Sequence, residues 1–215
     1  MDHMFPPVIV RIAARFTLIM VAQRDFWHQY ARMNRTGNDA GRSPATESRP
    51  LVERMPVYAL LDNIRSAWNV GSMFRSADAA GLAGMYLTGM TCTPPRPDLE
   101  KTALGATESV PWDYFQDPLA AAQAVKDAGR SLVVLEQTPD ACDWRHHSFE
   151  FPCCFVVGHE VRGVQPGILA LADQVVEIPM AGIKKSLNVA VSFGVLAFAV
   201  RNQWLARNND GMRHG

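Results

Sequence analysis

The chain has 215 residues, of which 48% are hydrophobic and 20% charged, enough for one well-buried domain with an extension but too few for two full domains. Lysine plus arginine equals aspartate plus glutamate at 21 each, so no global charge attracts nucleic acid, and such binding must rest on a local patch. The cysteines form no CxxC pair, which disfavours a zinc site or a disulfide framework and predicts reduced thiols in a cytoplasmic protein: Cys92, Cys142, Cys153 and Cys154.

The first 54 residues predict an extension in front of the folded domain. Residues 8–22 read VIVRIAARFTLIMVA, which is too short and too charged to span a bilayer. Arg11 and Arg15 interrupt the apolar run and disfavour a secretory signal, so we interpret this stretch as an amphipathic helix or a non-native leader. Residues 34–54 are polar, contain two prolines and two glycines, and have the composition of a linker or a disordered segment. The ordered domain is therefore predicted to begin near Met55.

The first half of the domain predicts a strand, a helix and a second strand. Residues 57–62 form an apolar run of strand length. Asn69 then suits the cap of a helix that ends at Gly81. The next strand is predicted at 85–88, and residues 101–111 predict a tight loop near a site.

The second half alternates strands with helices. Asp117 followed by Pro118 predicts the cap and first turn of an alanine-rich helix that ends at Gly129. A short helix at 167–172 precedes the last of three further strand-like runs, which are 131–136, 153–157 and 174–178. This alternation predicts an α/β fold with a parallel sheet and helices on both faces.

Residues 178–188 form a polar loop between the last strand and the apolar run 189–200. Unpaired amides at the start of a helix favour ligand binding there. An equally good interpretation is that Ser186 or Asn188 only caps the helix and that the two lysines of this loop, Lys184 and Lys185, are solvated. The helix predicted over 186–202 is apolar around nearly its whole circumference, so part of it should meet a second copy of the chain.

Several common enzyme classes lose support because their motifs are missing. The sequence contains no GxGxxG after the first strand, no GxxxxGK[ST], no HExxH and no GxSxG. Polar residues instead follow the predicted ends of three strands: Asn69, Arg75, Glu160, Ser186 and Asn188. Because the carboxyl ends of parallel strands share one edge of the sheet, these loops predict a single crevice.

Three blocks resemble, in order, the motifs of the SpoU (TrmH-like) family of RNA 2′-O-ribose methyltransferases in the SPOUT superfamily. They are NVGSMFRSADAAG at 69–81, FVVGHEVRGV at 155–164 and IPMAGIKKSLNVAVSFG at 178–194. The resemblance implies a C-terminal deep trefoil knot, which is an exception to the usual absence of knots. It also implies a homodimer and S-adenosyl-L-methionine as cofactor. The implied methyltransferase domain covers 55–205, after the partly disordered extension 1–54 and before a tail at 206–215.

The resemblance also implies site residues. The family's polar catalytic cluster corresponds to Asn69, Arg75, Glu160, Ser186 and Asn188. The cofactor would be held largely through the backbone of Leu135, Gly158, Ile178, Met180 and Leu187, with glycine allowing close approach. His159 stands where the family often has a small or amide residue, and Ala190 replaces a frequent serine. Neither departure removes a member of the cluster.

The implied reaction is attack of a ribose 2′-hydroxyl of tRNA or ribosomal RNA on the cofactor's methyl group. It needs alignment and partial loss of the hydroxyl proton, with no metal and no membrane. An arginine stays protonated, so Arg75 is expected to hold a phosphate and lower the hydroxyl's pKa rather than act as a base. Two alternatives stay open: a related enzyme that methylates a base, and an inactive RNA-binding dimer that binds the cofactor.

Residues 1–54 contain eight arginines and five acidic residues, a modest excess of positive charge. These arginines either help hold RNA or belong to a solvated arm.

Overall fold

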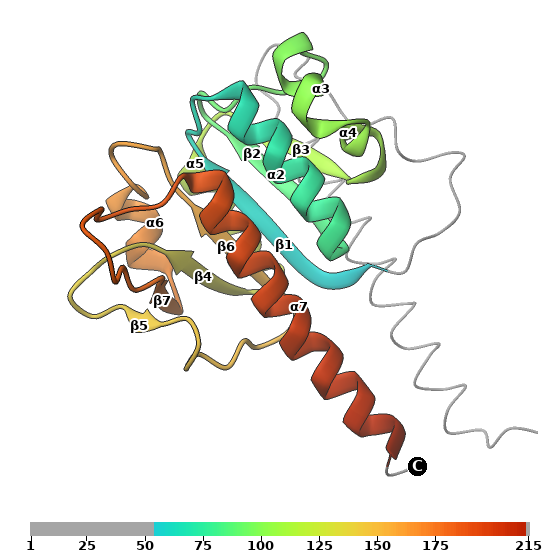
Figure 1. The fold of residues 1–215 in the computed structure, drawn as a ribbon, viewed down its shortest axis with the longest axis vertical. Coiled ribbons are helices and arrows are strands. Elements are labelled where there is room, and N and C mark those ends of the chain that lie inside the picture. Colours follow the sequence, from blue (N-terminus) through green and yellow to red (C-terminus); the bar gives the residue numbers. More distant parts are fainter. Residues whose placement is uncertain (1–53, 214–215) are drawn as a thin grey trace, which may run out of the picture. The chain divides into compact units, whose positions relative to one another are not determined.

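A seven-stranded parallel sheet lies at the centre of the computed structural model, which describes residues 54–213 (Figure 1). In chain order its strands are β1 (Met55–Asp62), β2 (Leu82–Thr88), β3 (Trp112–Phe115), β4 (Ser131–Leu135), β5 (Cys142–Asp143), β6 (Cys153–Val157) and β7 (Gln174–Glu177). Across the sheet their order is β3-β2-β1-β6-β4-β7-β5, and every neighbouring pair is parallel. The predicted parallel α/β class is confirmed.

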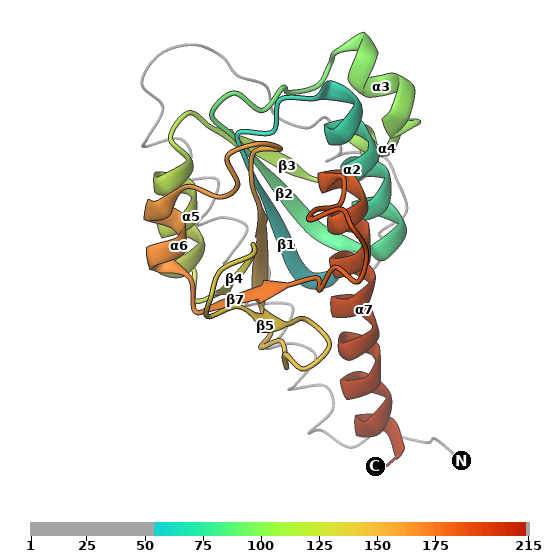
Figure 2. The same cartoon turned by 60° about the vertical axis from the view of Figure 1, so that its left-hand side comes forward.

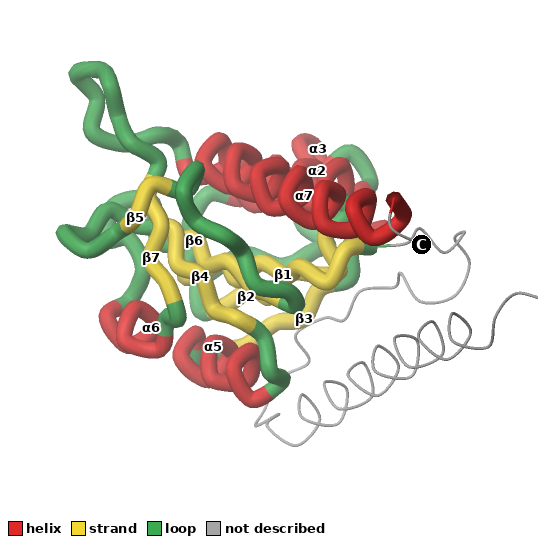
Figure 3. Tube along the Cα trace, turned by 90° about the horizontal axis from the view of Figure 1, so that it is seen from below, coloured by secondary structure: helices red, strands yellow, loops and turns green. Residues whose placement is uncertain are grey.

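Helices cover both faces of this sheet. They are α2 (Ala67–Ala80), α3 (Pro97–Ala103), α4 (Ala106–Ser109), α5 (Pro118–Asp127), α6 (Pro166–Leu171) and α7 (Val189–Arg213). Helices α2 and α7 lie on one face, and α5 and α6 lie on the other (Figures 2 and 3). Successive strand residues point to opposite faces, so Leu61 joins the core under α2 and α7 while Leu60 joins the core under α5 and α6.

Helix α2 begins earlier than predicted. Ser66, not Asn69, is the N-cap, and its hydroxyl accepts a hydrogen bond from the Asn69 amide at 3.3 Å. The prediction of Asn69 as cap was wrong because a serine three residues upstream takes that role. Gly81 ends the helix as predicted, with a left-handed φ of 75° that favours glycine. Asn69 therefore lies inside the first turn, and its side chain is free for other contacts.

The prediction of a loop over 101–111 was also wrong. Pro97 opens helix α3, and the left-handed residues Leu104 (φ 50°) and Gly105 (φ 82°) separate it from α4. These helices were missed because both are short and lack a clear apolar period. Strand β3 follows at once and was missed as well, since only Trp112 among its residues is fully buried.

The predicted cap at Asp117 is confirmed, because its carboxylate accepts from the Leu119 amide at 2.9 Å at the start of α5. Helix α7 starts at Val189 rather than at 186, and it continues through residues 206–213, which were predicted as a tail. Within the described chain one segment, Val189–Asn208, has the length and apolar composition of a membrane span. Its residues Phe193 and Leu196 are fully buried against the rest of the domain.

The predicted N-terminal extension, including the segment 8–22, lies outside the described residues except for Arg54. This residue fastens the start of β1 to its surroundings. Its guanidinium donates to the Leu82 and Ser109 carbonyls at 3.1 and 3.0 Å and to Asp78 at 2.9 Å. Strand β1 begins at Met55.

Candidate active site

Three of the five predicted cluster residues form one hydrogen-bonded chain at the carboxyl edge of the sheet. The Asn69 side-chain amide donates to Glu160 Oε1 at 3.1 Å, and the Asn188 amide donates to Asn69 Oδ1 at 3.2 Å. These residues follow β1, β6 and β7, respectively. The predicted convergence of three strand-end loops is therefore correct for these three side chains.

Glu160 also accepts hydrogen bonds from two backbone amides just before α2. The Arg65 amide donates to Oε2 and the Ser66 amide to Oε1, both at 3.1 Å. Partial burial by itself raises the pKa of Glu160, but hydrogen bonds from its own amide, Arg65, Ser66 and Asn69 together lower that pKa below its usual value. Glu160 is therefore a carboxylate at neutral pH that binds the start of a helix, where a negative charge is favourable.

This lowered pKa makes the contribution of Glu160 to stability pH-dependent. The contribution is complete above the unfolded-chain pKa of about 4.3 and is lost as the pH falls below it toward the folded-state pKa. We expect Glu160→Gln to have a smaller free energy of unfolding than the parent near pH 7. This difference in free energy should become smaller as the pH is lowered. Urea unfolding across that pH range measures the free energy of unfolding of each protein. Glu150→Gln is the control, because Glu150 is exposed and its replacement should change this free energy little at any pH. A difference that stays constant with pH would contradict the assignment.

The loop that carries Glu160 is fixed from both sides by acidic residues that sequence reasoning missed. Buried Asp62 accepts from the amide and side chain of Gln165 at 2.8 and 2.7 Å, and Glu136 accepts from the Val164 amide at 3.0 Å. Their sequence signal is an acid at the end of an apolar strand, in VYALLD and LVVLE. Charged acceptors of this kind hold backbone firmly.

Gly158 is required by the chain itself. A Cβ at this position would lie 2.3 Å from both the Gly163 carbonyl carbon and the Val164 nitrogen, far inside contact distance. The close approach predicted at Gly158 is therefore an approach of the loop's own backbone. His159 and Gly163 close this turn with backbone hydrogen bonds of 3.1 and 2.8 Å.

Arg75 and Ser186 do not join the hydrogen-bonded chain. Arg75 lies six residues after Asn69 on α2, which at 100° per residue places it on a different side of the helix. Its side chain is exposed and makes no hydrogen bond or ion pair within the described part of the chain. Ser186 is likewise exposed, in the loop between β7 and α7. Among the described residues, no hydrogen bond or ion pair joins Arg75 to Asn69 or Glu160.

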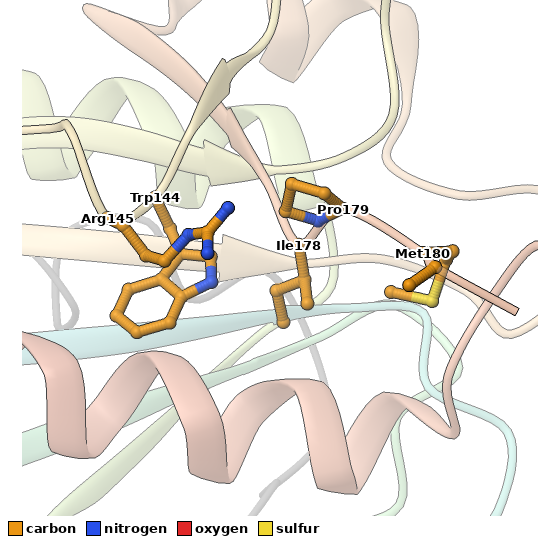
Figure 4. Close-up of a pocket in the computed structure, with 6 residues that line it drawn as sticks. Trp144, Arg145, Ile178, Pro179 and Met180 are labelled. Atoms are coloured by element: carbon orange, nitrogen blue, oxygen red, sulfur yellow. The ribbon is translucent and has the colours of Figure 1, made fainter.

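A pocket of about 310 Å³ opens beside the start of this loop. Its lining residues are Trp144, Arg145, Ile178, Pro179, Met180 and Ala181 (Figure 4). Ile178 and Met180 were predicted to hold the cofactor, while the predicted residues Leu135, Gly158 and Leu187 do not line this pocket.

Sequence reasoning missed Trp144 and Arg145 because they lie in a stretch that predicted only a loop. Strand β5 brings them next to β7, where the Trp144 amide donates to the Glu177 carbonyl at 3.0 Å. Asp143 holds Arg145 in place, and hydrogen bonds from Arg145 lower the pKa of Asp143 to about 2. The signal available in the sequence was an aromatic residue followed by an arginine.

This pocket has a mostly apolar lining, with one arginine. Its volume is within the range of small-molecule sites, and an indole with apolar side chains suits a purine base. The guanidinium of Arg145 already pairs with the Asp143 carboxylate through Nε and one terminal nitrogen, so one terminal nitrogen is left to donate to a ligand. Among the described residues no group of three or more histidines, cysteines and acids is placed to hold a metal ion.

Residues 56–198 match the protein-family model described as the SpoU rRNA Methylase family. The chain belongs to this family. It is 30% identical over 156 residues to a tRNA (guanosine(18)-2′-O)-methyltransferase of Thermus thermophilus, which covers 72% of this chain and 79% of that protein. The resemblance noted from the sequence motifs is confirmed.

Two solved structures are similar in both fold and sequence. The TrmH/SpoU tRNA modifying enzyme of A. aeolicus superposes with a TM-score of 0.65 at 26% identity, covering 74% of this chain and 79% of that chain. The SpoU methyltransferase AviRb of Streptomyces viridochromogenes, in complex with the cofactor AdoMet, superposes with a TM-score of 0.63 at 28% identity. That match covers 72% of this chain and 60% of the AviRb chain.

The two departures from the SpoU motifs lie next to members of the polar cluster. The ring of His159 is buried, and its Nδ1 accepts from the Val161 and Arg162 amides at 3.0 and 3.3 Å, so the histidine stabilises the turn that carries Glu160. Ala190 donates its amide to Asn188 Oδ1 at 2.8 Å, within the N-cap of α7. With histidine at 159 and alanine at 190, the hydrogen bonds among Asn69, Glu160 and Asn188 are still formed.

Proposed function

We propose that this SpoU family member transfers a methyl group from S-adenosyl-L-methionine to a ribose 2′-hydroxyl of structured RNA. The observation that carries this proposal is the hydrogen-bonded chain of Asn69, Glu160 and Asn188, which links all three motifs. The similar Thermus protein is a tRNA 2′-O-methyltransferase by name, so tRNA or ribosomal RNA is the proposed partner. The four free cysteines agree with the proposed cytoplasmic location.

The cofactor would occupy the pocket beside β7. When bound, it supplies an electrophilic methyl group on a sulfonium. We propose that Ile178 and Met180 hold it within this pocket. Leu135, Gly158 and Leu187, which lie outside the pocket lining, would hold the part of the cofactor that extends beyond it, largely through the backbone. Trp144 would add a stacking surface, and the terminal nitrogen of Arg145 that is not bonded to Asp143 would donate to its carboxylate.

We expect S-adenosylhomocysteine to bind without help from a metal ion. The pocket offers apolar side chains and one guanidinium, and the described residues contain no cluster of three or more histidines, cysteines and acids that could hold a metal ion. Titration calorimetry should therefore give the same affinity with and without a chelator. An affinity that disappears on chelation would contradict this prediction.

The polar residues would align the RNA rather than react covalently. We propose that Arg75 contacts the phosphate beside the acceptor ribose and that its charge favours loss of the hydroxyl proton. Its exposed position is compatible with a direct contact to RNA. Asn69, Glu160 and Asn188 would fix the three loops around the acceptor, and Ser186 would shape the cofactor loop.

We further propose that the C-terminal part of the chain forms a deep trefoil knot and that the chain is a homodimer. Support for the dimer comes from α7, where Val191, Phe198 and Leu205 are 52%, 44% and 41% exposed at a spacing of seven residues. This spacing places the three apolar side chains on nearly the same side of the helix. Exposed apolar stripes of this kind are typical of contacts between protein chains.

We expect the wild-type protein to be dimeric at micromolar concentration and Phe198→Asp to weaken the dimer strongly, because a charge would be buried without a partner. Light scattering measures the molecular mass of the wild-type protein and of the variant in solution. Leu104→Asp is the matched control, since Leu104 is 65% exposed but lies on α3's C-cap, away from α7. A monomeric wild type would contradict the proposed dimer.

The activity is tested by single-turnover transfer of labelled methyl to total tRNA and to ribosomal RNA. Nuclease digestion followed by mass analysis then reports the nucleotide and the modified atom. A methyl group on ribose supports the proposal, and a methyl group on a base supports the related base methyltransferase. Binding of RNA and cofactor without any transfer would indicate the inactive dimer.

A further inference from the structure

Trp68 is a large apolar side chain that stays exposed beside the active-site cluster. It lies in the first turn of α2, one residue before Asn69, and is 51% exposed. Tryptophan is highly buried on average, so an exposed indole next to a candidate site requires an explanation. Lys101 of α3 places its Nζ 5.7 Å from the centre of the indole ring, within the range of a cation–π contact.

Close packing of α3 on α2 fixes this pair. A Cβ on Gly71 would lie 2.2 Å from the Leu99 carbonyl oxygen, so only glycine allows the helices to approach this closely. The Trp68 carbonyl accepts from Ser72 Oγ at 2.8 Å and from Thr102 Oγ1 at 3.1 Å. The backbone at Trp68 and the helix that carries Lys101 are thus held by the fold.

The exposed charges around the indole are partly basic. Lys101 lies 3.8 Å from Asp98, but both side chains are at least half exposed, so this pair contributes little and leaves the ammonium available. Arg65 precedes α2 and Arg75 lies two turns along it, and both are exposed. Of these basic side chains Lys101 contacts the indole, and the Glu160 carboxylate is bound to the backbone amides just before α2.

We propose that Trp68 and Lys101 bind an unpaired nucleotide next to the acceptor nucleotide, a role that rests on the proposed function. The base stacks on the indole, and the Lys101 ammonium contacts its phosphate. Proteins recognise single-stranded RNA by such stacking, and a base can stack on a side chain only where it is not stacked inside a duplex. The substrate is therefore a loop or an end of an RNA rather than the middle of a duplex.

The test compares Trp68→Ala, Trp68→Phe and Lys101→Ala with the wild-type protein. The probes are bulk tRNA and a single-stranded oligoadenylate, and binding is followed by tryptophan fluorescence and by filter retention. Leu104→Ala is the matched control, because Leu104 is 65% exposed three residues after Lys101. Calorimetry with S-adenosylhomocysteine and thermal unfolding verify that each variant is folded.

We expect Trp68→Ala to weaken binding of both RNAs about 5-fold or more, whereas Trp68→Phe retains most of the affinity because a smaller ring still stacks. Lys101→Ala should reduce the slope of log affinity against log salt by about one. Cofactor affinity should be unchanged in all variants. In transfer assays Trp68→Ala should raise KM more than it lowers kcat, because stacking is present before the transition state.

Unchanged RNA affinity in folded Trp68→Ala would overturn this inference, even when the wild type transfers methyl normally. Weaker RNA binding in that variant, in a protein that transfers no methyl to any RNA, would support the inference and overturn the proposed function. A wild type that binds neither RNA would overturn both. A change in dimer mass instead of RNA affinity would show that Trp68 contacts protein, which also overturns the inference.

Discussion

Replacing Arg75 with alanine is expected to lower methyl transfer about 100-fold or more, a loss of roughly 2.7 kcal/mol of transition-state stabilisation. Arg75 is exposed and makes no hydrogen bond or ion pair with the described residues, so its removal leaves no buried group without a partner. The affinity for S-adenosylhomocysteine should therefore stay nearly the same. Single-turnover transfer to tRNA and ribosomal RNA measures the rate, and calorimetry measures the affinity.

Arg75→Lys should recover little of the rate. A lysine supplies a point charge, whereas the planar guanidinium can donate two parallel hydrogen bonds to a phosphate. Arg207→Ala is a suitable control, because Arg207 is an exposed arginine near the end of α7 that donates to Ser148. If Arg75 is only a solvated helix residue, its variants will change stability by no more than about 0.5 kcal/mol and leave the transfer rate unaltered. That result would falsify the catalytic role.

The fold was predictable from the sequence where local chemistry determines the structure. The apolar run at 57–62, the glycine after α2 and the cap at Asp117 each specify one local conformation. Prediction failed where neighbouring residues compete, as at Ser66 and Asn69, which both suit a cap while only one can hold that position. It also failed at 101–111, where two short helices are stabilised by packing of α3 against α2 around Gly71.

The candidate site was predictable only as far as the motifs extend. Asn69, Glu160 and Asn188 belong to three motifs and do meet, although 119 positions separate the first from the last. Asp62 supports the same loop through contacts with Gln165, 103 positions away, and no local pattern in the sequence reports such a pairing. Trp144 and Arg145 reach the pocket only because β5 pairs with β7. Contacts between distant segments depend on the assembled sheet.

Gly158→Ala is expected to destabilise the protein by about 2–3 kcal/mol and to abolish most of the activity. The new Cβ would lie 2.3 Å from two backbone atoms of Gly163 and Val164, and backbone cannot move aside as a flexible side chain can. The turn between 158 and 163 must open, which displaces Glu160 from Arg65 and Ser66. Gly182→Ala is the matched control, because a Cβ there meets no atom within 4 Å.

Urea unfolding of both glycine variants, with and without S-adenosylhomocysteine, separates two reasons for the glycine at 158. If the cofactor needs the space, Gly158→Ala will bind it poorly while the cofactor-free protein keeps its parental stability. If the loop's own backbone needs the space, the cofactor-free protein will already be less stable, and the loss of binding will follow from the displaced loop. The contacts with Gly163 and Val164 favour the second result. Parental stability in cofactor-free Gly158→Ala would show that the turn tolerates a methyl group and would contradict this account.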